Sequence, residues 1–121
     1  MAPSGSARDI PRPRHVHGVQ GAVHATKSFA RLFLIPGANH CGGGPSTSGA
    51  DWFSPVVNWV ENGVAPESVI GTAAATGNPF PGRTRPLCPY PQYAHYKGSG
   101  DINVAANFVC RADADDGDEE E

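Results

Sequence analysis

The tripeptide Asn39-His40-Cys41 places an imidazole beside a thiol, and three successive glycines follow it before Pro45. It comes shortly after the apolar run Leu32-Phe33-Leu34-Ile35, which ends at Pro36-Gly37. An imidazole that a strand delivers to a loop can take a proton from a hydroxyl group and return it to a leaving group. His40 is therefore the candidate catalytic residue of this sequence.

Five blocks of the sequence, in the same order, match the pattern of one enzyme family. They are Phe29–Gly37 with His40–Pro45, Asn58–Gly63 with Ala65–Glu67, Arg83–Pro91, Tyr96–Gly100, and Ala105–Phe108 with Cys110. On these residues, the segment from about Ser28 to Cys110 resembles the C-terminal end of the tannase and feruloyl esterase family. The resemblance covers roughly two thirds of the chain.

The resemblance implies an α/β fold class, namely a C-terminal fragment of an α/β-hydrolase fold. The fragment would hold the last core strand, the catalytic-histidine loop, the C-terminal helix and an extended, loop-rich end, and it would not be a complete domain. Residues 1–27 would be an irregular, unmatched segment, 28–110 the hydrolase part, and 111–121 a disordered acidic tail. The length of 121 residues agrees, because a complete fold of this kind usually needs more than ~250 residues.

The resemblance also implies a secreted carboxylic ester hydrolase, a serine esterase whose full-length form cleaves small aromatic-acid esters. Such an enzyme needs a serine and a carboxylate that both precede the histidine in this fold. Only 39 residues precede His40; they contain no Gly-x-Ser-x-Gly motif, and Asp9 is their only acid. We therefore expect the serine and the acid to lie outside this chain, which alone should not turn over esters. The alternative is a non-catalytic remnant or a small extracellular interaction module.

Three cysteines allow three single-bridge pairings, and the sequence by itself selects none of them. In the resembled family, the cysteine after the histidine is bridged to the cysteine before the nucleophilic serine. Cys41 would therefore be unpaired here, with its partner absent, and potentially reactive. The family's other C-terminal pair matches Cys88 and Cys110.

The sequence predicts no cofactor and no metal ion. The family's calcium site lies in a lid domain outside this segment, and the acidic tail lacks the ligand spacing of a calcium loop. A zinc site made of the three cysteines and a histidine would lack any C-x-x-C spacing. His15, His17 and His24 have no cysteines or carboxylates clustered near them, so we interpret them as exposed polar residues. Gly42–Gly44 precedes Pro45, where a phosphate-binding loop needs a lysine.

The formal net charge of −3 conceals a mildly basic body, because seven of the twelve acidic residues lie in Asp113–Glu121. The remaining five acids face nine bases, but no basic stripe with interleaved aromatics predicts nucleic-acid binding. No apolar stretch approaches the ~20 residues that span a bilayer, so no membrane partner is predicted. Met1–Asp9 lacks the apolar core of a secretory leader, and the expectation of secretion rests on the resemblance.

The expected elements are short. The run 30–35 predicts a strand buried on both faces of a parallel sheet. Asp51 or Ser54 should start a helix that ends at Gly63, and Pro55 in the first turn favours the later start. The spacing of Phe53, Val56, Val57 and Val60 gives this helix one apolar face, and core packing is expected for Trp52 and Trp59. Residues 64–73 predict a turn and a strand, 76–82 a loop, 83–96 an extended edge segment, and 101–108 a helical turn capped by Asp101.

Overall fold

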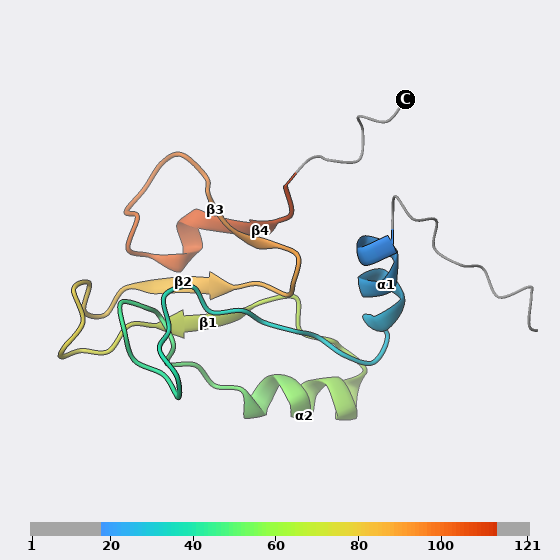
Figure 1. Ribbon diagram of the computed structural model, residues 1–121. Coiled ribbons are helices and arrows are strands. Elements are labelled where there is room, and N and C mark those ends of the chain that lie inside the picture. The colour runs from blue at the N-terminus through green and yellow to red at the C-terminus, as the bar shows by residue number, and fades with distance from the viewer. Residues whose placement is uncertain (1–17, 114–121) are drawn as a thin grey trace, which may run out of the picture. The chain divides into compact units, whose positions relative to one another are not determined.

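The structure is a computed structural model that describes residues 18–113, and the chain divides into two compact units. One unit comprises residues 1–30 and 114–121, of which the described part holds helix α1 (Gly18–Thr26). The second unit, Arg31–Asp113, holds all the other elements (Figure 1). The two units are described separately below.

The second unit contains one α-helix and two small antiparallel sheets. Its elements are α2 (Phe53–Asn62), β1 (Val69–Thr72), β2 (Thr84–Leu87), β3 (Tyr93–Tyr96), the 3-10 helix η3 (Ala105–Asn107) and β4 (Phe108–Arg111). Strand β1 pairs with β2, and β3 pairs with β4 in a register that sets Ala94 opposite Cys110. Strand β2 also lies against β3, η3 and β4, so the two sheets contact each other through it.

The core of this unit is small and gathers around the end of β2. The buried apolar side chains are Val69, Ala73, Pro86, Leu87, Cys88, Pro89 and Ala105. A disulfide joins Cys88, directly after β2, to Cys110 in β4, with 5.6 Å between the two Cα atoms. This is the pairing that the resemblance implied, and it ties the hairpin of β3 and β4 to the first sheet.

Helix α2 ends at Gly63 as expected, but it begins at Phe53, earlier than the start that Pro55 favoured, and its apolar face is not buried. The Asp51 carboxylate accepts the free N–H groups of Phe53 and Ser54 at 3.0 and 3.1 Å, and Gly63 ends the helix with a φ of 72°. Phe53, Val56 and Val60 are exposed by 76%, 54% and 79%, and Val57 is half-buried. Their spacing predicts an apolar face, but within the described residues nothing covers it. The expectation of core positions was wrong for the two tryptophans, because Trp52 is 38% exposed and Trp59 is half-buried.

The run 30–35 does not form the doubly buried strand that was expected. The segment pairs with its neighbour through a single antiparallel bridge between Phe33 and Pro89. Next to this bridge, the N–H of Tyr90 donates to the Leu32 carbonyl at 2.7 Å. Phe33 packs on Trp52, with 5.3 Å between ring centroids, while Leu32 and Leu34 are each 57% exposed. Successive side chains of an extended segment point to opposite faces, and only one face of this segment packs against the rest of the unit, so Leu32 and Leu34 on the other face are exposed.

Two other expectations also differ from the structure. Residues 18–26 form α1 although the segment up to residue 26 was expected to be irregular; Ala22, Val23 and Ala25 sustain the helix despite its glycines, and Lys27 donates to the Val23 carbonyl at 3.0 Å. Asp101 does not cap η3, because its carboxylate accepts the N–H of Asn103, two residues before that turn begins. The strand expected within 64–73 is confirmed as β1, and the extended segment 83–96 contains β2 and β3.

The first prediction concerns the disulfide. The double variant Cys88→Ser/Cys110→Ser should lower the free energy of unfolding by about 3 kcal/mol, because the unfolded chain regains the freedom of a loop that the bridge closes over 22 residues. Urea unfolding followed by tryptophan fluorescence measures this difference. Cys41→Ser is the matched control and should unfold like the unchanged chain; equal midpoints for the control and the double variant would contradict the prediction.

The second prediction concerns the start of α2. Hydrogen bonds from the Ser54 side chain and from the backbone of Ser54 and Phe53 hold the pKa of Asp51 below its ordinary value of 3.8. A depressed pKa in the folded state stabilises the fold above the ordinary value, and this stabilisation is lost as the pH falls below it. Circular dichroism should show α2 losing signal below pH 3.8, and Asp51→Asn should remove this step. Glu67→Gln is the control for loss of a charge and should keep the step.

Candidate active site

His40 lies at the tip of a short loop that folds back on itself between Pro36 and Pro45. The turn is closed by backbone hydrogen bonds from Asn39 N–H to the Gly43 carbonyl at 3.2 Å and from Gly42 N–H to the Asn39 carbonyl at 2.9 Å. The ring of His40 is exposed. The loop therefore presents the imidazole to solvent at its outer end, as a general base requires.

The two ends of this loop are packed too closely for any residue but glycine. A Cβ atom on Gly44, where φ is 81°, would lie 2.6 Å from the Gly37 carbonyl oxygen. Asn78 fixes the same end from outside the loop, because its side-chain amide donates to the carbonyls of Gly44 and Ser46 at 3.3 and 3.0 Å. The base of the loop is thus held in place while its tip stays accessible.

Cys41 is in direct contact with the candidate base. Its Sγ atom lies 3.3 Å from Nδ1 of His40. Cys41 is exposed and unpaired, and it is the one non-glycine residue with a positive φ, 69°, among residues 18–113. This backbone conformation is unusual for a side-chain-bearing residue and turns the thiol toward the imidazole.

The part of the chain that the structure describes brings neither a serine nor a carboxylate to His40. The nearest serines along the chain are engaged elsewhere, since Ser46 donates to the Gly43 carbonyl at 2.9 Å and Ser48 accepts the Gly43 N–H at 3.4 Å. Ser4, Ser6 and Asp9 lie outside the described residues. Nε2 of the His40 ring has no hydrogen-bond partner within residues 18–113.

A metal centre finds no support within residues 18–113, where no group of three or more His, Cys, Asp or Glu side chains is close enough to hold an ion. His24 lies exposed in the last turn of α1. His15, His17 and the acidic tail beyond Asp113 lie outside the described residues. Within the same range, neither α-helix has the length and apolar character that crossing a bilayer requires.

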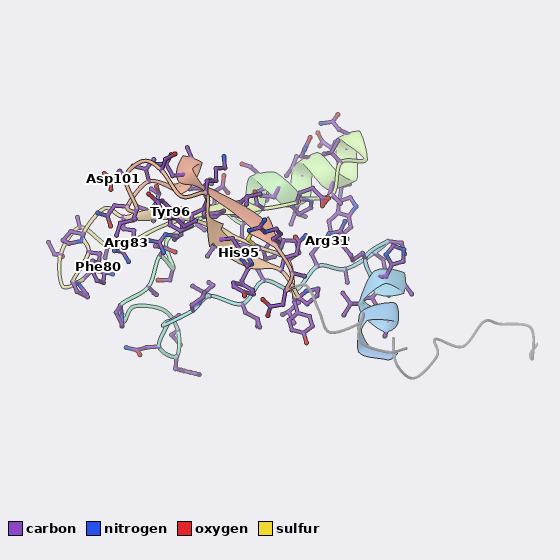
Figure 2. All side chains as sticks on the ribbon, turned by 90° about the horizontal axis from the view of Figure 1, so that it is seen from above. Arg31, Phe80, Arg83, His95, Tyr96 and Asp101 are labelled. Atoms are coloured by element: carbon purple, nitrogen blue, oxygen red, sulfur yellow. A yellow bond between two sulfur atoms is a disulfide. The ribbon has the colours of Figure 1, made fainter. Side chains whose placement is uncertain are left out.

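Sequence reasoning missed a cluster of polar side chains on the strands beyond the loop. Arg83 and Arg85 occupy alternate positions on and beside β2, and an R-x-R pattern in a strand was the signal that could have found them. On the other sheet, the Tyr93 hydroxyl donates to the Asp113 carboxylate, and this hydrogen bond raises the pKa of the phenol. His95 packs beside Tyr93 and contacts the Arg111 carbonyl at 3.0 Å (Figure 2).

Comparison with known proteins finds one family and several related enzymes. Residues 11–111 match the family described as tannase and feruloyl esterase. The chain is 55% identical over 95 residues to the mono(2-hydroxyethyl) terephthalate hydrolase of Piscinibacter sakaiensis, a match that covers 75% of this chain and 15% of that protein. It is 43% identical over 95 residues to a probable feruloyl esterase of Arthroderma benhamiae, covering 77% of this chain and 18% of that protein.

A solved structure extends the likeness to three dimensions. The crystal structure of feruloyl esterase B from Aspergillus oryzae matches with a TM-score of 0.59 at 29% identity, over 81% of this chain and 22% of that one. This likeness agrees with the α/β-hydrolase class, although the described residues hold only short antiparallel pairs. The chain spans less than a quarter of the length of the relatives named here.

The third prediction concerns the thiol at this site. Under native, non-reducing conditions, Ellman's reagent should titrate one thiol per chain, because Cys41 is exposed and the other two cysteines are bridged. Cys41→Ser should titrate none, and reduction followed by unfolding should release all three thiols of the unchanged chain. Two or three thiols in the native chain would show that the bridge is not formed.

Proposed function

Because the chain belongs to the tannase and feruloyl esterase family, we propose that it is the C-terminal part of a carboxylic ester hydrolase and that His40 is the general base and acid of that enzyme. The observation that carries this proposal is the exposed imidazole at the tip of a loop whose base is fixed at Gly37, Gly44 and Asn78. The substrate class we infer is an ester of an aromatic acid, in keeping with the names of the related enzymes.

In the proposed reaction, Nε2 of His40 takes the proton of a serine hydroxyl as its oxygen attacks the ester carbonyl. The same nitrogen then gives this proton to the departing alcohol, and it repeats both transfers when water releases the acid. Nδ1, which lies 3.3 Å from Cys41 Sγ, is the atom that the carboxylate of such a triad contacts. The serine and the carboxylate come from polypeptide outside residues 18–113, and Cys41 serves as the tethering neighbour of the base.

The uncovered apolar side chains of α2 support the proposal that this chain is one part of a larger hydrolase domain. Phe53, Val56 and Val60 together present a continuous apolar stripe, since they are spaced three and four residues apart. Burial of such a stripe is worth about 25 cal/mol per Å² of apolar surface removed from water. The remainder of the hydrolase domain is the surface that we propose covers it.

Secretion is also part of the proposal. The supporting observation is the disulfide between Cys88 and Cys110, because structural disulfides form and persist in oxidising compartments. A protein-bound metal or organic cofactor has no role in the proposed chemistry.

A segment exchange tests the role of His40. Residues 28–113 replace the matching C-terminal segment of the Piscinibacter sakaiensis hydrolase, to which the chain is 55% identical, and the chimera is assayed on that enzyme's own ester. We expect turnover, and His40→Ala should lower kcat by at least about a thousandfold. The matched control is His95→Ala, which removes another imidazole and should leave kcat within about twofold.

The alternative reading, a non-catalytic remnant or interaction module, predicts a different result. A folded chimera that is inactive with His40 intact, or one that is equally active with His40→Ala, would remove His40 from the catalytic machinery. The unmodified chain assayed alone should not hydrolyse an aryl ester, because no serine or carboxylate of residues 18–113 contacts the imidazole.

The fourth prediction tests what covers α2. The double variant Val56→Asp/Val60→Asp should leave the free energy of unfolding of the isolated chain nearly unchanged, because both side chains are already in water. In the chimera, the same change should lower the melting temperature sharply, since it would bury two unpaired charges. Glu61→Gln, on the same helix, is the control for both proteins. An equal, small effect in the two proteins would show that the stripe stays exposed.

A further inference from the structure

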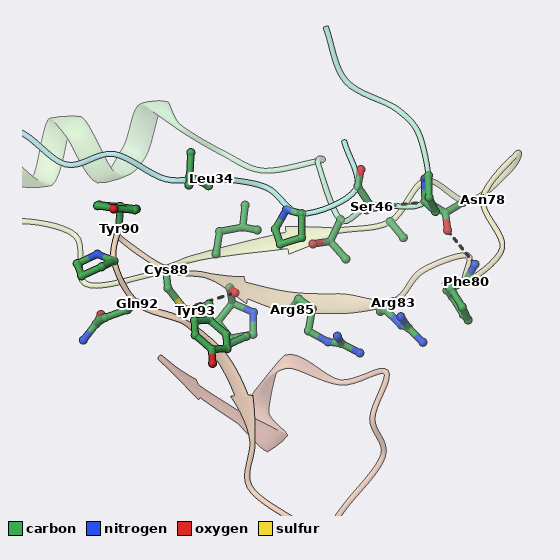
Figure 3. Close-up of a pocket in the computed structure, with 18 residues that line it drawn as sticks. Leu34, Ser46, Asn78, Phe80, Arg83, Arg85, Cys88, Tyr90, Gln92 and Tyr93 are labelled. Carbon is green, nitrogen blue, oxygen red and sulfur yellow. Dashed lines mark hydrogen bonds between the residues drawn. The ribbon is translucent and has the colours of Figure 1, made fainter. Parts of the chain in front are cut away.

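Strand β2 carries two positive charges on one of its faces. Arg85 pairs with Gly71 in the ladder, and two residues earlier the Arg83 carbonyl accepts the N–H of Ala73 at 2.7 Å, so Arg83 continues the same ladder. Side chains alternate along a strand, and residues two apart therefore point to the same face. Figure 3 shows both side chains extending to the same side of β2.

The guanidinium group of Arg83 is held in place without being neutralised. Its Cζ atom lies 3.7 Å from the centroid of the Phe80 ring, and its Nε–H donates to Oδ1 of Asn103 at 2.7 Å (Figures 2 and 3). Stacking on a ring and one fixed acceptor set the plane of the group. Within residues 18–113, its two terminal nitrogens have no acceptor.

Arg85 is held in the same manner and, like Arg83, uses only one of its N–H donors within residues 18–113. Its Cζ atom lies 4.1 Å from the centroid of the Phe108 ring, and Nη2 donates to the Ile102 carbonyl at 2.6 Å. Its Nε atom is buried and has no hydrogen-bond partner. Burial, and after it the positive charge of Arg83, lowers the pKa of Arg85.

Neither arginine forms an ion pair with any residue that the structure describes. Two adjacent guanidinium groups with free N–H donors are suited to an anion with two oxygens, since each planar fork matches a carboxylate. A carboxylate between them would accept from terminal N–H groups that are unused within residues 18–113 and would offset the repulsion between the two charges. The chemistry of the pair thus points to a carboxylate ligand.

A cavity next to the pair supplies space for the rest of such a ligand. Its volume is about 480 Å³, within the range of small-molecule sites, and Arg83 and Arg85 are the only charged residues among those described that line it. The rings of Phe80, Tyr90 and Tyr93 also line it (Figure 3). The cavity therefore combines a doubly positive edge with an apolar, aromatic lining.

We propose that Arg83 and Arg85 form a binding site for the carboxylate of a small aromatic carboxylic acid, whose ring lies in this cavity. The site requires no chemical step, so it goes beyond the ester hydrolysis proposed above. Binding of a carboxylate to the isolated chain tests this site separately from catalysis, because the isolated chain is not expected to turn over an ester. A failure of this inference is thereby distinguishable from a failure of the role proposed for His40.

Titration of the full 121-residue chain with benzoate tests the inference, with NMR detection of the arginine Nε–Hε signals. The signals of Arg83 and Arg85 should shift with saturation, and benzamide, which has the same shape without the charge, should bind at least tenfold more weakly. Arg83→Gln and Arg85→Lys should each weaken benzoate binding by about tenfold, the second because an ammonium group cannot reproduce the planar fork.

The control is Arg111→Gln on β4, which removes an exposed arginine that does not line the cavity. It should leave the affinity for benzoate unchanged. The inference is overturned if benzamide binds as well as benzoate, if Arg111→Gln weakens binding as much as Arg83→Gln, or if no saturable shift occurs up to tens of millimolar benzoate. Because Arg85 contributes to packing on Phe108, Arg83→Gln decides the matter should Arg85→Lys fail to fold.

Discussion

The bridge between Cys88 and Cys110 is the constraint that holds the unit Arg31–Asp113 together. Few apolar side chains are buried in this unit, and small cores supply little net stability by themselves. Cys88 lies between Leu87 and Pro89, which are both almost fully buried. The bridge therefore anchors β4, and the hairpin that β4 forms with β3, at the point where packing is densest.

The position of His40 follows from this anchor through a short chain of contacts. Pro89 and Tyr90, directly after the bridged cysteine, pair with Phe33 and Leu32. That pairing fixes the segment that enters the loop, and the amide of Asn78 fixes the residues that leave it. An imidazole on a loop fixed at both ends keeps its orientation at little entropic cost, which is what proton transfer within a preassembled site requires.

The sequence predicted those features of the fold that depend on a few neighbouring residues, such as the ends of α2. Asp51 and Gly63 identify the ends of α2, because a carboxylate satisfies the first free amides and a glycine accepts the left-handed conformation. Burial is not a local property: the spacing of Val56 and Val60 indicates an apolar face but does not say what covers it. The same holds for Leu32 and Leu34, where an apolar run was interpreted as buried on both faces. The role of His40 was predicted from a resemblance and from its loop, and it stays a prediction.

The apolar stripe on α2 and the arginine pair beside β2 require different kinds of partner. The stripe of Phe53, Val56 and Val60 carries no charge, so an apolar protein surface can cover it without leaving any group unpaired. Arg83 and Arg85 cannot be covered in this way, because burying a guanidinium group without a counter-charge costs several kcal/mol. An oxygen-bearing anion meets that requirement by accepting from terminal N–H groups that the two arginines leave unused within residues 18–113. Both regions are open to contact with a partner. Because the α2 stripe carries no charge, it suits packing against another protein surface, whereas the two positive charges beside β2 suit the binding of an anionic ligand.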